Sequence, residues 1–119
     1  MLVAVELPLL DAGWRCGFAE FARRAGDFAL AMAVVALRME GGRVAEARIA
    51  LGGIGGQPQL APEAAALLLG SDPLAAAGAA GDSAAAACDA QDDIHAPADY
   101  RRDLVRVMLR RAIEDAIAA

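Results

Sequence analysis

The chain has 119 residues, of which 58% are apolar, and a formal net charge of −5. This length suits a single domain that buries roughly two-thirds of its unfolded surface, and the apolar content argues against disorder. All eleven basic residues are arginine, and no concentrated basic arm is present, which argues against nucleic-acid binding. Because the chain has no lysine, it contains neither a Walker phosphate loop nor a Schiff-base nucleophile.

Membrane and export signals are also absent from the sequence pattern. The apolar run 28–37 is free of charge for only ten residues, whereas a helix that spans a bilayer needs about 20. The first residues carry Glu6 and no basic region, unlike a signal peptide. Cys16 and Cys88 lack CxxC spacing, so we expect two reduced thiols in a cytoplasmic protein.

Two short strands are predicted in the first 23 residues. Residues 2–7 alternate well enough to form a strand, which Pro8 would end. A domain that opens directly on a strand suggests that the chain was cut from something longer. Residues 14–23 form the second predicted strand, with Trp14, Cys16 and Phe18 on one side.

Residues 28–39 carry the strongest strand pattern. Their bulky residues alternate with alanines at Phe28, Leu30, Met32 and Val34. Both faces of this strand are apolar, which predicts a central strand covered on both sides. The pair Gly41–Gly42 then predicts a tight hairpin into a strand over 43–51. In that strand we expect Val44, Glu46 and Arg48 to face outward, and Ala45, Ala47, Ile49 and Leu51 to face inward.

The second half of the chain predicts helices over residues 62–69, 73–89 and 97–117. Pro62, Pro73 and Pro97 suit first helical positions, and the last segment carries a broad apolar stripe at helical spacing. The glycine-rich run 52–56 is not GxGxxG; we interpret it as a strand-to-helix loop, with a phosphate cradle as the alternative. Strands followed by helices predict an α+β fold in which an antiparallel three- to four-stranded sheet packs on about three helices. We expect residues 1–119 to form one domain.

Few residues are equipped for catalysis. His95 is the only histidine, so a metal site would need Asp92 and Asp93 beside it, and an ordinary loop histidine is the simpler interpretation. Ser71 and Ser83 lie in no nucleophile motif. We therefore predict no catalytic residues and no metal site, and no autonomous catalytic centre.

A charged cluster precedes the strongest strand, at Arg23, Arg24 and Asp27. A guanidinium group there can bind an anion or stack on a flat ring. Asp27 can hold an arginine in a bidentate ion pair or cap the turn at Gly26. A purely structural ion pair is the alternative to a binding role.

The sequence around this cluster resembles a known family. Residues 18–29, FAEFARRAGDFA, resemble the Arg-Arg-x-x-Asp-x-Ala segment of the flavoprotein subunits of molybdenum hydroxylases, such as the CO dehydrogenase medium subunit and the FAD region of xanthine dehydrogenase. Residues 48–54 resemble the strand and glycine turn of that family, and residues 93–102 its loop into a Tyr-Arg-Arg helix. Residues 1–8 are similar to the strand that opens its C-terminal domain.

The resemblance implies the C-terminal domain of a FAD-containing subunit, part of an oxidoreductase. It implies an upstream FAD-binding domain, an iron–sulfur subunit and a molybdenum subunit as partners, with electrons passing from molybdenum through iron–sulfur clusters and FAD to an acceptor. It also implies that Arg23, Arg24 and Asp27 lie near the flavin, where positive charge favours its reduced anionic form. This domain alone is expected not to retain FAD. The alternative is a stand-alone, non-enzymatic interaction or dimerisation module of the same fold.

Overall fold

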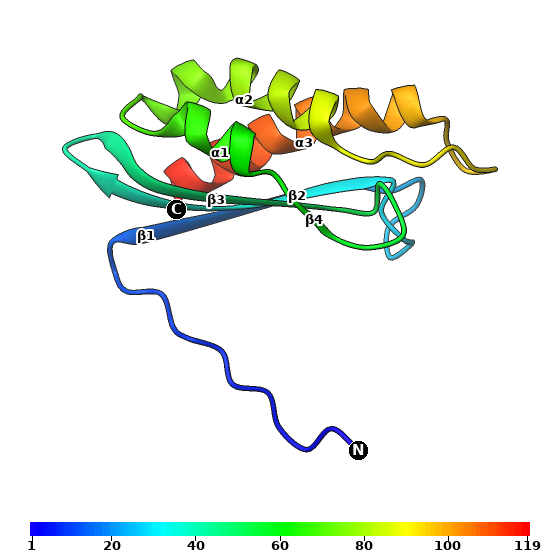
Figure 1. The fold of residues 1–119 in the computed structure, drawn as a ribbon, viewed down its shortest axis with the longest axis horizontal. Coiled ribbons are helices and arrows are strands. Elements are labelled where there is room, and N and C mark those ends of the chain that lie inside the picture. Colours follow the sequence, from blue (N-terminus) through cyan, green and yellow to red (C-terminus); the bar gives the residue numbers. More distant parts are fainter.

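A four-stranded antiparallel sheet forms the first half of the structure, a computed structural model that describes all 119 residues (Figure 1). The strands lie side by side in chain order: β1 (Trp14–Phe21), β2 (Ala31–Glu40), β3 (Arg43–Gly52) and β4 (Gln59–Leu60). Gly41 and Gly42 both have positive φ, 57° and 77°, as a tight two-residue hairpin requires. The predicted hairpin is therefore confirmed.

Three helices follow and lie on one face of this sheet (Figure 1). They are α1 (Pro62–Leu68), α2 (Pro73–Ala87) and α3 (Ala98–Ala118). α3 packs on β1 and β2, α1 packs on β3, and α2 packs on both other helices. The Asp72 carboxylate caps α2 by accepting hydrogen bonds from the amides of Leu74 and Ala75. The predicted α+β fold is confirmed, and no helix combines the length and apolarity needed to cross a bilayer.

The core lies between the helices and the odd-numbered residues of β2. Ala31, Ala33, Val35 and Leu37 are fully buried against α3, whose apolar stripe is buried in turn. β1 packs tightly on α3 at Gly17, where an added Cβ would lie 1.9 Å from the carbonyl oxygen of Ala112. The close approach of sheet and helix at this contact therefore requires glycine at position 17.

The central strand differs from its prediction in two respects. β2 begins at Ala31, so Phe28 and Leu30 precede the strand, and Phe28 is 94% exposed. The prediction that both faces are covered is wrong within these 119 residues, because the helices cover only one face. Val34, on the other face, is 43% exposed.

The predicted strand over residues 2–7 is absent. Residues 1–11 form no strand, and the first ten are all exposed. The segment leaves the start of β1 on the side of the sheet opposite the helices (Figure 1). A strand needs a neighbour for its backbone groups, and β1, the edge strand, pairs only with β2. The alternating side chains of residues 2–7 are therefore not enough to form a strand without a neighbouring strand.

A β-bulge reverses the predicted orientation of Val44. Arg38 pairs with Glu46 and Met39 pairs with Val44, which leaves Ala45 without a partner on β2. The extra residue in β3 reverses the face of the sheet on which the preceding side chains lie. Val44 is consequently 1% exposed and Ala45 is exposed, so the predicted outward Val44 and inward Ala45 were both wrong.

Candidate functional site

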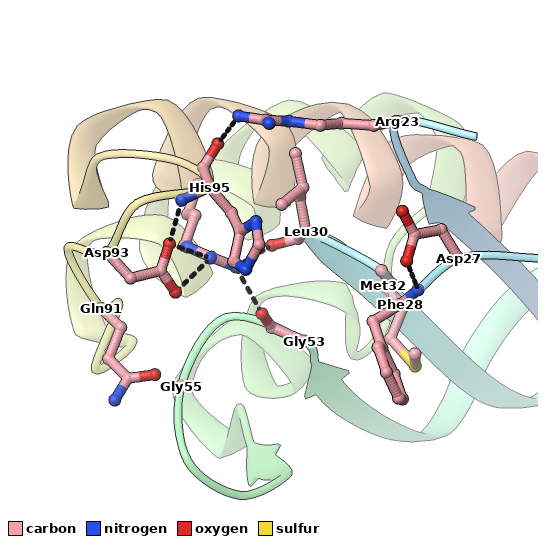
Figure 2. A pocket seen from close by; sticks show the side chains of 12 residues that line it. Arg23, Asp27, Phe28, Leu30, Met32, Gly53, Gly55, Gln91, Asp93 and His95 are labelled. Carbon is pink, nitrogen blue, oxygen red and sulfur yellow. Dashed lines mark hydrogen bonds and ion pairs between the residues drawn. The ribbon is translucent and has the colours of Figure 1, made fainter.

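One end of the sheet carries a pocket of about 440 Å³. Three loops form it: the β1–β2 loop, the β3–β4 loop, and the segment between α2 and α3 (Figure 2). Its lining consists of Arg23, Asp27, Phe28, Ala29, Leu30, Met32, Gly53, Gly55, Gln91, Asp93, His95 and Arg101. Two of the three predicted site residues, Arg23 and Asp27, line this pocket, whereas Arg24 lies exposed on the same loop outside the lining.

Arg101 holds the three loops together. Arg101 lies in the first turns of α3 and is only 4% exposed. Its Nη1 donates to the carbonyl oxygens of Leu30 (2.9 Å) and Gly53 (2.6 Å). Its Nη2 donates to both carboxylate oxygens of Asp93, at 2.9 and 2.8 Å. A buried guanidinium needs such partners to offset its desolvation, and here they come from every loop of the pocket.

The Asp93 carboxylate organises its own loop as well. Its Oδ1 accepts hydrogen bonds from the amides of His95 (2.9 Å) and Ala96 (3.1 Å). These bonds to the charged form, led by that from Ala96 and followed by that from Arg101, lower the pKa of Asp93 from 3.8 to about 2. The neighbouring Asp92 accepts from the amide of Ala98, 2.6 Å away, at the start of α3. Asp92 and Asp93, the two acids considered as metal ligands from the sequence, thus both accept hydrogen bonds from backbone amides.

The lowered pKa of Asp93 predicts a loss of stability in acid. A carboxylate whose folded pKa lies below its unfolded value stabilises the fold above the unfolded pKa, about 4, and that contribution disappears as pH falls through about 2. We expect Asp93→Asn to be less stable than the parent at neutral pH, with the difference shrinking between about pH 4 and pH 2. Urea unfolding midpoints across this range measure it. A difference that stays constant with pH would contradict the assignment.

Arg23 reaches across the pocket rim to the third loop. Its Nη2 donates to the carbonyl oxygen of His95, as Figure 2 shows. The Arg23 residue is exposed, and its remaining N–H groups have no hydrogen-bond partner in the chain. The guanidinium is therefore positioned by one hydrogen bond and still available to a ligand.

Asp27 caps a turn and forms no ion pair with either arginine. Its Oδ1 accepts from the amide of Phe28 at 2.8 Å, and its own amide donates to the carbonyl oxygen of Arg24. Gly26 provides the positive φ, 81°, that this turn needs. Of the two roles that sequence reasoning left open for Asp27, turn formation describes the geometry. The structural ion pair is absent from the chain's salt bridges.

Phe28 and Arg101 are site residues that sequence reasoning missed, and Asp93 was considered only as a metal ligand. Phe28 had been assigned to the strand, and an exposed aromatic ring at a pocket mouth has no periodic signature. Arg101 and Asp93 are eight residues apart, a spacing that predicts no contact between a loop and a helix. The motif around Tyr100 marked that helix as notable, but only the fold assigns Arg101 its partners.

The arrangement suits binding better than catalysis. It offers a positioned guanidinium at Arg23, which can bind an anion or stack on a flat ring, and an exposed aromatic ring at Phe28. The glycine-rich loop packs against protein: a Cβ on Gly53 would lie 2.6 Å from the carbonyl oxygen of Ala29, and one on Gly55 would lie 2.8 Å from that of Asp89. The pocket therefore presents groups at its rim that can bind an anion or a flat ring.

Comparison with known proteins places the chain in one family. The family model described as the CO dehydrogenase flavoprotein C-terminal domain matches residues 17–116. The chain is 38% identical over 117 residues to the nicotine 6-hydroxylase medium subunit of Paenarthrobacter nicotinovorans, spanning 98% of the chain and 41% of that protein. It is 36% identical over 122 residues to the carbon monoxide dehydrogenase medium chain of Afipia carboxidovorans, spanning 99% and 41%.

Solved structures share the fold. A reconstituted CO dehydrogenase from Oligotropha carboxidovorans superimposes with a TM-score of 0.87 at 35% identity, over 94% of this chain and 40% of that one. Quinoline 2-oxidoreductase from Pseudomonas putida 86 gives 0.82 at 36% identity, over 88% and 37%. The chain therefore spans about two-fifths of the length of these relatives.

Proposed function

The chain belongs to the CO dehydrogenase flavoprotein C-terminal domain family, and from this we propose that it is the C-terminal domain of the FAD-containing medium subunit of a molybdenum hydroxylase. Two relatives are named as medium subunits or chains of such enzymes, nicotine 6-hydroxylase and carbon monoxide dehydrogenase. A medium subunit implies partner subunits. We propose a molybdenum subunit, an iron–sulfur subunit and the FAD-binding part of the medium subunit as partners, in the cytoplasm.

The pocket at the end of the sheet carries this proposal. Its β1–β2 loop presents Arg23, Asp27 and Phe28, with Arg24 exposed beside them. FAD, when bound, accepts electrons from the metal centres and passes them to an acceptor. Arg23 places positive charge at the pocket rim, where it favours negative charge on a bound ring. Arg24 adds charge to the same loop, and Asp27 holds the loop in shape.

The role of the loop is testable in an assembled enzyme. We expect Arg23→Ala, in a nicotine 6-hydroxylase whose medium subunit carries this chain in place of its own C-terminal two-fifths, to lower the flavin reduction potential. A loss on the order of 30 mV corresponds to about tenfold in the two-electron equilibrium. Arg24→Ala should have a smaller effect in the same direction, because its side chain lies outside the pocket lining.

Potentiometric titration and flavin content measure this effect. Arg111→Ala is the control: Arg111 is an exposed arginine on α3, and the substitution removes the same charge from the helix face. If Arg23→Ala and Arg111→Ala give the same potential and flavin occupancy, a flavin role for Arg23 is wrong.

The isolated chain should be colourless after purification. Its pocket offers a ring-binding rim, and the residues needed to hold the rest of a dinucleotide would come from the other part of the subunit. Visible absorbance of the purified protein and of its denatured supernatant measures bound flavin. A yellow preparation with one flavin per chain would show that these 119 residues suffice for binding.

A second candidate is a stand-alone interaction or dimerisation module. The observation that favours it is the sheet face opposite the helices, where Val34 and Phe18 are exposed. The genomic context discriminates: a reading frame that continues upstream of Met1 into a flavin domain supports the first proposal, and a promoter and ribosome-binding site directly before Met1 support the second.

A further inference from the structure

Strand β1 lies at one edge of the sheet and has a free side. It pairs only with β2, so every second residue directs its backbone groups away from the sheet. The carbonyl oxygen of Gly13 accepts from the amide of Met39 on β2, which places the odd-numbered residues of β1 at the hydrogen-bonded positions. The amides that face the free edge are therefore those of Trp14, Cys16, Phe18 and Glu20. A free edge of this kind is a template for pairing with another strand.

Asp115 of α3 occupies the middle of this edge. Its Oδ2 accepts a hydrogen bond from the amide of Phe18, 3.0 Å away, although the two residues are 97 positions apart in the sequence. The tight packing of Gly17 on the α3 backbone brings the helix close enough for this side chain to reach the strand. The carboxylate thus lies where an incoming strand would have to place a carbonyl oxygen.

The rest of the edge is open on both sides of Phe18. At the start of the strand, the amide of Trp14 donates to the carbonyl oxygen of Asp11 at 3.2 Å. The edge-facing amides of Cys16 and Glu20 have no hydrogen-bond partner in the chain. Asp115 is therefore the one side chain that blocks the centre of an otherwise available edge.

The free edge of β1 is complementary to itself. An antiparallel pair of two β1 strands centred on Phe18 places Phe18 opposite Phe18 of the second copy, Cys16 opposite Glu20, and Arg15 opposite Phe21. The open amides at Cys16 and Glu20 then gain carbonyl partners, and no two like charges lie opposite each other. The Phe18 side chain, 49% exposed in the single chain, forms an aromatic pair across the contact. The same patch serves both copies, as a two-fold dimer requires.

We propose that Asp115 keeps β1 from pairing with β1 of a second copy of this chain. The carboxylate acts in two ways. It binds the amide at the centre of the edge, and its negative charge repels the carbonyl oxygens that a second strand must bring to the same place. The proposal concerns only the sheet and α3, and it does not rest on the proposed function.

Amide hydrogen exchange in the unsubstituted chain tests the contact itself. The amides of Cys16, Phe18 and Glu20 lie on the same edge, and only that of Phe18 has a partner. After correction for the intrinsic exchange rate of each amide, Phe18 should exchange about tenfold or more slowly than the other two. Nuclear magnetic resonance resolves the three amides individually. Equal rates at all three would overturn the proposal.

Removal of the carboxylate should open the edge. We expect the unsubstituted chain to sediment as a monomer, and Asp115→Ala to shift to a dimer as its concentration rises. Glu114→Ala is the matched control: Glu114 is the neighbouring acid on α3 and pairs with Arg110 at 3.0 Å, so this variant loses the same charge and should stay monomeric. Analytical ultracentrifugation over a range of concentrations makes the comparison.

A third substitution tests whether the edge carries the dimer. Cys16→Pro removes an edge-facing amide that has no partner in the chain, and proline is tolerated on an edge strand where its nitrogen faces away from the sheet. Added to Asp115→Ala, it should restore the monomer.

Three results in these variants would overturn the proposal. An Asp115→Ala protein that stays monomeric at its highest soluble concentration means that the edge does not pair. Equal dimerisation of Glu114→Ala means that any loss of negative charge on α3 brings the copies together. A dimer that survives Cys16→Pro means that the copies meet elsewhere. If Asp115→Ala fails to fold, the exchange rates in the unsubstituted chain still decide whether Asp115 protects the edge.

Discussion

Replacement of Arg101 by leucine is expected to destabilise the protein by about 3 kcal/mol, within the range measured when one partner of a buried ion pair is removed. The substitution leaves the carbonyl oxygens of Leu30 and Gly53 without their donor and the Asp93 carboxylate without its counter-ion. Asp93 keeps 35% side-chain exposure and can be hydrated, which places the cost at the lower end of that range.

Arg102→Leu is the matched control for Arg101→Leu. The two arginines are adjacent on α3, but Arg102 pairs at 3.2 Å with Asp99, whose side chain is 97% exposed. Such a surface pair contributes about 0–1 kcal/mol. Urea unfolding followed by circular dichroism compares the two variants, and limited proteolysis of residues 91–97 reports whether the loop has been released. Equal losses in the two variants would mean that Arg101 does not hold the pocket together.

Gly17→Ala is expected to destabilise the protein by an amount at or above the upper end of the about 1–3 kcal/mol typical of overpacking. The added methyl group would lie 1.9 Å from the carbonyl oxygen of Ala112 and 2.5 Å from the amide nitrogen of Ala116. Both are backbone atoms of α3, so no side chain can rotate away. β1 and α3 must move apart, which weakens the contact between the edge strand and the longest helix.

Gly78→Ala, the same chemical change at another position, is expected to stabilise the protein. Gly78 lies inside α2, and no atom lies within 4 Å of its added Cβ. Alanine in a helix interior is favoured over glycine by about 1 kcal/mol, so this variant should be more stable than the parent. Thermal unfolding of both variants makes the comparison. A Gly17→Ala protein as stable as the parent would contradict the tight β1–α3 approach.

The secondary structure could be predicted closely because its signals are local. The strand period, the Gly41–Gly42 turn and the prolines at Pro62 and Pro73 act within a few residues of the backbone they shape. The helices observed begin and end within two residues of the predicted ranges. The bulge at Ala45 escaped prediction, since it depends on how β3 meets β2.

The candidate site was only partly predictable. Arg23 and Asp27 were identified through resemblance and a dense cluster of charge, and both line the pocket. The ion pair, one of the two roles left open for Asp27, is absent, and the Asp27 carboxylate instead accepts a hydrogen bond from the amide of Phe28. The exposed ring of Phe28 followed from where β2 begins, which the alternating pattern placed three residues too early.

The sequence by itself determined three of the four strands, the three helices, their order and hence the α+β class, because backbone preference and side-chain period operate over short stretches of chain. The short strand β4 was not predicted. Tertiary structure alone decided which face of β2 is covered, whether residues 2–7 find a strand to pair with, and what Arg101 binds. Arg101 contacts Leu30 across 71 residues of sequence and Gly53 across 48. Contacts at such separation depend on where whole elements pack, and no pattern within either segment specifies them.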